Sequence, residues 1–202
     1  MSLLQARRIT MASIKLKTYP DFAKTLIEAA YRVEVGARDK VFEESPKMAA
    51  VFDKVANWLV DPTKDGLVLS GICGNGKTTM IRAIKAIYGA YNVPDGYGGK
   101  VYLRVVSARD LARMDSNGLE DLAKERFLAV DDLGTEPVEV VQYGNIFEPF
   151  KQVFEKRYDQ RMATILSTNI ETKDIRPIYG DRIADRFNEM MTTVVFPDRT
   201  YR

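Results

Sequence analysis

The segment from which this sequence is best interpreted is Gly71-Ile72-Cys73-Gly74-Asn75-Gly76-Lys77-Thr78-Thr79. It follows a short apolar run at 67–69, which predicts a strand, and it leads into residues 80–87, whose apolar spacing predicts a helix. A strand, a glycine-rich turn that ends in Gly-Lys-Thr, and a helix together form the phosphate-binding P-loop. The pattern therefore predicts a nucleotide-binding unit at this point of the chain.

The residue types of this turn suit the binding of phosphate groups. Glycines allow positive φ values that other residues resist, so successive backbone N–H groups can point inward at an anion, and the following helix N-terminus adds partial positive charge. We expect Lys77 to contact the β- and γ-phosphates of ATP and Thr78 to ligate Mg²⁺. The predicted nucleotide-binding residues are Gly71, Cys73, Gly74, Asn75, Gly76, Lys77, Thr78 and Thr79.

Composition narrows the class of protein. The chain has 202 residues, of which 46% are hydrophobic, and this fits one α/β domain with a modest extension. A single cysteine, Cys73, and the absence of histidine exclude internal disulfides, a Cys/His zinc site and histidine-based catalysis. The net charge of +2 does not by itself indicate nucleic-acid binding.

Nothing in the sequence indicates a membrane protein. The first residues lack the apolar core of a signal peptide, and no run approaches the ~18 apolar residues of a membrane span, so we expect a soluble, cytoplasmic protein. Residues 1–19 carry Arg7, Arg8, Lys15 and Lys17 without an acidic residue. Such an arm either contacts a partner or nucleic acid or is simply solvated.

Two aspartates follow a second apolar run, in Phe127–Asp132. Ligands of open parallel sheets bind outside the carboxyl ends of the strands. We expect Asp131 to bind Mg²⁺, directly or through water, and Asp132 to orient or polarise an attacking water. Aspartates also end strands as simple turn caps, but the upstream P-loop favours interpretation of this pair as a Walker B motif.

A third apolar run, Thr164–Asn169, ends in an asparagine that either hydrogen-bonds the attacking water or the γ-phosphate or is a plain turn residue. The alternation of such strands with helices predicts an α/β fold with a mostly parallel sheet. A helix over residues 20–36 is expected to bury Phe22, Leu26, Ala29, Ala30 and Val33. A helix over residues 145–158 is expected to bury Ile146, with Pro149 kinking it or shifting its start.

Four markers occur in a fixed order: the P-loop, Phe127–Asp132, Thr164–Asn169 and Arg182–Phe187. Together they resemble the AAA+ ATPases of the DnaC-like helicase-loader type, with IstB-type transposition helpers as close relatives. The phrase Val130–Gly134 is particularly similar to that group. The resemblance covers roughly residues 40–197, so residues 1–44 are interpreted as an arm and helix with a possible partner-binding role and residues 45–202 as the ATPase domain.

The resemblance implies a five-stranded sheet in which the Asn169 strand lies between the P-loop strand and the Asp131 strand. Asn169 would be sensor 1, and Arg186 or Arg182 would be an arginine finger acting on a neighbouring subunit, with Arg186 preferred. Only residues 197–202 follow the last predicted strand, so the helical lid of many AAA+ proteins is expected to be absent or minimal.

By the same resemblance, the protein would bind ATP and Mg²⁺, form a homo-oligomer when ATP is bound, and load a replicative ring helicase onto single-stranded DNA. A transposition or phage-replication helper is an alternative within the same class. A P-loop small-molecule kinase and a nucleotide-gated scaffold with negligible hydrolysis are alternatives from other classes. Arg104, Arg109 and Arg113 either contact DNA directly or are solvated surface charges.

Overall fold

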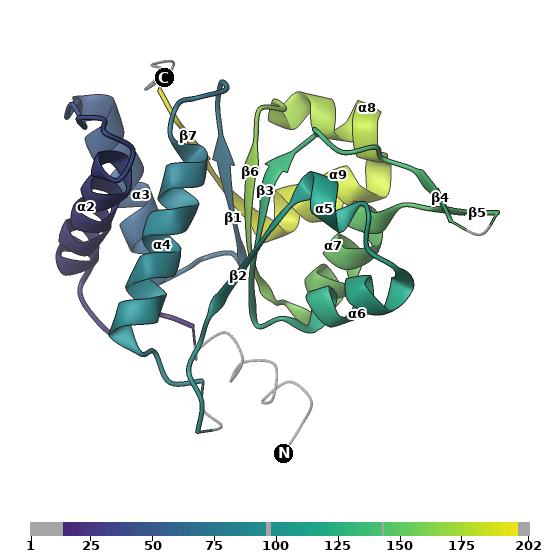
Figure 1. Cartoon of the computed structure of the whole chain (residues 1–202), viewed down its shortest axis with the longest axis horizontal. Coiled ribbons are helices and arrows are strands. Elements are labelled where there is room, and N and C mark those ends of the chain that lie inside the picture. The colour runs from purple at the N-terminus through teal and green to yellow at the C-terminus, as the bar shows by residue number, and fades with distance from the viewer. Residues whose placement is uncertain (1–13, 96–97, 143, 198–202) are drawn as a thin grey trace.

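A five-stranded parallel sheet organises the molecule, as the computed structural model shows for residues 14–95, 98–142 and 144–197 (Figure 1). The strands are β1 (Gly66–Ser70), β2 (Leu103–Ser107), β3 (Phe127–Leu133), β6 (Ala163–Thr168) and β7 (Met191–Val195). The order across the sheet is β2-β3-β6-β1-β7, and every pairing is parallel. The predicted α/β class with a mostly parallel sheet is therefore confirmed.

Strand β6 lies between β1 and β3, as the resemblance implied. Gly66 pairs with Thr164 on one side of β6, and Phe127 pairs with Ala163 on the other. Because parallel strands end at the same edge, this order brings the P-loop after β1, the aspartates of β3 and the end of β6 together. The three central strands β1, β3 and β6 are mostly apolar and buried on both faces, as expected when helices cover both sides of a sheet.

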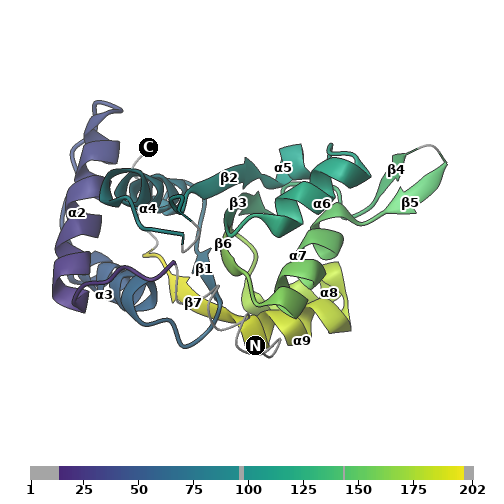
Figure 2. The ribbon, with the colours of Figure 1, turned by 90° about the horizontal axis from the view of Figure 1, so that it is seen from below.

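Helices form a layer on each side of the sheet (Figure 2). One layer contains α2 (Pro20–Gly36), α3 (Pro46–Val60) and α4 (Lys77–Tyr91). The other contains α5 (Ala108–Leu111), α6 (Ser116–Lys124), α7 (Pro149–Gln160), α8 (Ile175–Tyr179) and α9 (Asp181–Met190), with a short 3₁₀ turn at Thr172–Asp174. Each layer has its own cluster of buried apolar side chains against one face of the sheet.

The predicted buried face of helix α2 is only partly confirmed, because Leu26 and Ala30 pack against the core while Ala29 is exposed. Phe22 and Val33, which we expected inside, are 47% and 70% exposed. Tyr31 instead packs edge-on against Phe42 and Phe52, with ring centroids 5.3 and 5.4 Å away. The buried side chains of α2 recur every four residues and are Ala23, Ile27, Tyr31 and Val35. Two sets of apolar residues lie along different sides of this helix, so sequence spacing alone does not determine which set is buried. The contacts of Tyr31 with Phe42 and Phe52 determine it.

The segment after β3 also differs from the prediction. Residues Asn145–Phe147 form strand β5, which pairs antiparallel with β4 (Val140–Gln142) in a hairpin that projects from the body (Figure 1). Ile146 is consequently 68% exposed instead of buried. Helix α7 begins at Pro149, as expected for a proline that shifts the start. The proline ring clashes with helical backbone at the residue before it, so that residue favours an extended conformation. This favours a strand over an earlier helical turn.

Two of the expectations concern residues outside the described ranges. Residues 198–202, on which the expectation of an absent or minimal lid depends, are not described, and neither are Arg7 and Arg8 of the basic arm. Within the described ranges, no helix has both the length and the apolar character needed to span a bilayer.

Candidate nucleotide-binding site

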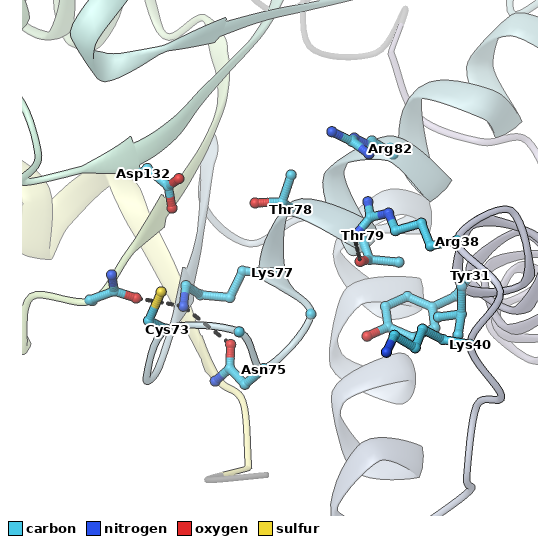
Figure 3. Close-up of a pocket in the computed structure, with 14 residues that line it drawn as sticks. Tyr31, Arg38, Lys40, Cys73, Asn75, Lys77, Thr78, Thr79, Arg82 and Asp132 are labelled. Carbon is cyan, nitrogen blue, oxygen red and sulfur yellow. Dashed lines mark hydrogen bonds between the residues drawn. The ribbon is translucent and has the colours of Figure 1, made fainter. Parts of the chain in front are cut away.

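The glycine-rich turn joins the end of β1 to the start of α4, in the strand–turn–helix arrangement that its sequence predicted (Figure 3). The backbone φ values of this turn are 145° at Gly71, 83° at Gly74 and 99° at Gly76. Residues other than glycine rarely adopt such positive values. Gly76 has a second constraint, because a Cβ atom there would lie 1.9 Å from the Tyr31 hydroxyl oxygen. The turn therefore depends on glycine for its backbone shape and for the close approach of α2.

Lys77 is the first residue of α4; its side chain folds back onto the turn and the residue is only 4% exposed. Its Nζ donates to the backbone oxygens of Gly71 and Ile72, both at 2.7 Å, and to Oδ1 of Asn75 at 3.1 Å. It also donates to Oδ1 of Asn169 at 2.7 Å, which joins the P-loop to the end of β6. Burial lowers the pKa of Lys77 from its usual range, and nearby carboxylates partly oppose that shift.

The two aspartates of β3 both face this site because the strand is irregular. In a regular strand, consecutive side chains point to opposite faces of the sheet. Here the pairing of β3 with β6 shifts register between Val130 and Leu133, and Asp132 adopts a left-handed φ of 59°. Asp131 Oδ1 accepts a hydrogen bond from Thr78 Oγ1 at 3.1 Å, while Asp132 lines the cavity. The bulge thus redirects one side chain toward the site.

Ser167 of β6 is a residue of the site that the sequence analysis missed. Its hydroxyl donates to Oδ1 of Asp131 and accepts from the backbone N–H of Asp132 at 2.8 Å. The side chain is completely buried, so it orients the Asp131 carboxylate and stabilises the unusual backbone of Asp132 together. A polar serine directly after the apolar pair Ile165 and Leu166, near the end of a buried parallel strand, was the signal that could have identified it.

A cavity of about 260 Å³ opens beside the P-loop. Its walls come from the turn and the start of α4, from the strand ends at Asp132 and Asn169, and from α2 with the segment after it. The last wall was not predicted, and it contributes Tyr31, Val35, Arg38 and Lys40. No local pattern marks these residues, because their place beside the P-loop follows from the packing of α2 on α4.

The ligand set suits magnesium bound together with a phosphate chain. Among the described residues, no group of three or more acidic, histidine or cysteine side chains could hold a metal alone. A P-loop site needs only a hydroxyl and a carboxylate from the protein, because phosphate oxygens and waters complete the octahedron. Thr78 and Asp131 supply that pair, and their hydrogen bond shows that both oxygens reach the same point.

The structure does not bring the two candidate finger arginines to this cavity. Both lie on α9, in the other helical layer from α4 (Figure 2). The Arg186 side chain is 16% exposed; it pairs with Glu155 and Asp159 at 3.2 and 3.4 Å and lies over the Tyr158 ring. The Arg182 side chain is 70% exposed, with its Nε 2.9 Å from Glu155.

Comparison with known proteins gives structural matches. No protein-family model matches this sequence, and no curated protein matches it either. The crystal structure of the DnaC helicase loader superposes with a TM-score of 0.57 at 18% identity, over 77% of this chain and 93% of that one. The crystal structure of DnaI gives 0.61 at 17% identity, over 84% and 94%. The replication initiator DnaA, bound to AMPPCP and single-stranded DNA, gives 0.54 at 18% identity, over 80% and 50%.

The sheet order, the P-loop and the structural matches define the class as an AAA+ P-loop NTPase fold. The chain shares this fold with the DnaC helicase loader, with DnaI and with DnaA. The chain spans about half the length of the matched DnaA chain.

Proposed function

We propose that this protein binds and hydrolyses Mg·ATP and uses the cycle to load a replicative ring helicase onto single-stranded DNA. The observation that carries the nucleotide part is the convergence of three separate segments on one cavity. Lys77 bonds to Asn169 at 2.7 Å, and Thr78 bonds to Asp131 at 3.1 Å. These two contacts hold the start of α4 against the ends of β6 and β3, where a phosphate chain and its cation would be bound together.

Each residue has a defined task in this proposal. The Lys77 ammonium exchanges its contacts with turn oxygens for oxygens of the β- and γ-phosphates, and the backbone N–H groups of the turn surround the chain. Thr78 and Asp131 hold Mg²⁺, which neutralises charge on the phosphate oxygens. Asp132 orients the attacking water, and Asn169 contacts the water or the γ-phosphate.

An arginine from a neighbouring subunit completes the site, which makes the ATP-bound protein a homo-oligomer. Charge that develops on the γ-phosphoryl oxygens is stabilised by a guanidinium supplied in trans. Exposure favours Arg182 over Arg186 for this role. Arg186 is held by two carboxylates and an aromatic ring, so its release would cost those contacts. Among the described residues, Arg182 forms an ion pair with Glu155 alone.

The choice of partner rests on the structural matches. A structure with the same fold belongs to a helicase loader, and another was determined with AMPPCP and single-stranded DNA. We assign the contact with the helicase to residues 1–44, because the outer face of α2 leaves Phe22 and Val33 exposed.

The test has two parts. Purified protein is assayed for Mg²⁺-dependent phosphate release from ATP, and ATP-loaded protein is used to capture partners from its own host. We expect hydrolysis and the recovery of a ring helicase. Recovery of a transposase instead would move the protein to the transposition helpers, and transfer of phosphate to an added nucleoside or metabolite would make it a kinase.

A further inference from the structure

The wall of the cavity on the α2 side carries an excess of positive charge that the P-loop motif does not explain. Four cationic residues and one carboxylate line the cavity: Arg38, Lys40, Lys77 and Arg82, with Asp132. Lys77 belongs to the P-loop, but the other three cations do not. Within the described ranges, neither Arg38 nor Arg82 forms a salt bridge with a carboxylate.

The two arginines flank the last residue of the P-loop. Nη1 of Arg38 lies 3.3 Å from Oγ1 of Thr79, which is 4% exposed in the first turn of α4. Arg82 follows Thr79 by three residues on α4, a spacing that places side chains on the same side of a helix. Figure 3 shows Arg38 reaching over from the α2 side to Thr79, with Arg82 beyond it on the helix.

This arrangement places two guanidinium groups on one wall of the cavity, whereas the acidic residue that lines it, Asp132, belongs to β3. Guanidinium groups are planar donors that match the oxygens of phosphate, and they are charged at any physiological pH. Two of them beside the positive end of α4 form a local excess of positive charge that an anion would relieve. The same cavity already has the features of a phosphate site, so the anion expected is part of the same nucleotide.

The position of Arg38 and Arg82 determines which end of a bound nucleotide they contact. Asp132, which is suited to orient the attacking water, lies on the other side of the first turn of α4 from Arg38 (Figure 3). Asn169, suited to the γ-phosphate or the water, is bonded to Lys77 at the start of that turn. A nucleotide whose γ-phosphate faces Asp132 therefore has its α-phosphate toward Thr79. This orientation rests on the proposed ATPase function.

We propose that Arg38 and Arg82 form a second phosphate-binding group, outside the P-loop, that contacts nucleoside di- and triphosphates at the α-phosphate end. Arg38 belongs to the segment after α2 and Arg82 to α4, so a bound phosphate joins the two elements. Occupancy of the ATP site is in this way coupled to the position of α2, the helix to which partner contact is assigned.

The experiment is isothermal titration calorimetry of the full chain with ATP and with ADP. The variants are Arg38→Gln and Arg82→Gln. Lys85→Gln is the matched control, because Lys85 is an exposed cation one turn further along α4 that does not line the cavity. We expect each arginine variant to bind both nucleotides about tenfold more weakly, since a charge-assisted contact is lost, while the control keeps the wild-type affinity.

If the wild-type chain binds both nucleotides, any of three results would overturn this inference and leave the proposed function unaffected. They are unchanged affinity in both arginine variants, a loss confined to ATP that places the contact at the γ-phosphate, and an equal loss in Lys85→Gln that reflects only overall charge. Thermal unfolding of each variant verifies that the fold is retained. A wild-type chain that bound neither nucleotide would overturn the proposed function and this inference with it.

Discussion

Thr78 and Asp131 are 53 residues apart in the chain, yet Thr78 Oγ1 donates a 3.1 Å hydrogen bond to Asp131 Oδ1. The contact joins the first turn of α4 to the end of β3, two strands away from β1 in the sheet. Strand β6 lies between β1 and β3, and the hydroxyl of its Ser167 donates to the same Asp131 oxygen. A P-loop hydroxyl and a strand-end carboxylate thus meet at one point, where a magnesium ion can be shared.

Lys77→Ala should weaken ATP binding by at least about 100-fold, because a buried ammonium in contact with phosphate is worth ~3 kcal/mol. Titration calorimetry with ATP measures the loss. Circular dichroism serves as the control for folding, since the substitution also removes hydrogen bonds to Gly71, Ile72 and Asn169. An unchanged affinity in a folded variant would remove the claim that this turn cradles the phosphates.

Asp132→Asn should retain ATP binding and lower turnover by about 10²- to 10⁴-fold, because the amide no longer acts as a base toward the attacking water. Asparagine tolerates left-handed backbone, so the φ of 59° at this position should persist. Steady-state phosphate release measures turnover, and nucleotide titration verifies binding. Full activity would assign the water-orienting role to another residue.

Ser167→Ala should raise the Mg²⁺ concentration needed for half-maximal ATP hydrolysis several-fold. The substitution removes the hydroxyl that orients Asp131 and leaves the backbone N–H of Asp132 without its acceptor. An unsatisfied buried group costs about 1–3 kcal/mol, so the free energy of unfolding should also fall by that amount. A magnesium titration identical to that of the wild type would restrict Ser167 to a structural role.

Arg182→Ala should leave ATP affinity of the single subunit intact and lower turnover of the assembly by about 10³-fold, the range found for arginine fingers. Mixing Arg182→Ala with Asp132→Asn subunits should restore part of the activity. In the mixed assembly, the intact ATP site of an Arg182→Ala subunit receives Arg182 from a neighbouring Asp132→Asn subunit. Absence of any recovery across all mixing ratios would argue against a shared site.

Arg186→Ala is the companion variant and should act mainly on stability. It removes the ion pairs with Glu155 and Asp159 and the contact with the Tyr158 ring, which together hold α9 on α7. Chemical denaturation should show a lower free energy of unfolding, with turnover in the folded fraction retained. A loss of turnover larger than that of Arg182→Ala, at unchanged stability, would make Arg186 the finger.

Gly76→Ala, directly before α4, should destabilise the protein and abolish nucleotide binding, whereas Gly89→Ala within α4 should be neutral or stabilising by about 0.5–1 kcal/mol. A Cβ at Gly76 would overlap the Tyr31 hydroxyl and force a side chain into φ of 99°, but a Cβ at Gly89 meets nothing within 4 Å. Thermal unfolding and ATP titration compare the two. Equal behaviour of the variants would contradict the close approach of α2 to the P-loop.

Local patterns in the sequence were enough to predict the strand–turn–helix of the P-loop and the α/β class. These features depend on short-range chemistry: glycine spacing, apolar periodicity, and charged residues at strand ends. The strand order came from the resemblance of four motifs to a known family, because non-local pairing leaves little trace in a single sequence. The roles of Lys77, Asp132 and Asn169 stay predictions that the variants above examine.

Only the tertiary structure decided which face of α2 is buried, how β3 turns both Asp131 and Asp132 to the site predicted for them, and that Arg38 reaches Thr79. Each depends on a partner far away in the chain: the aromatic rings beside Tyr31, the register shift against β6, and the packing of α2 on α4. Such contacts arise from the fit of whole elements against one another, so short-range periodicity does not encode them.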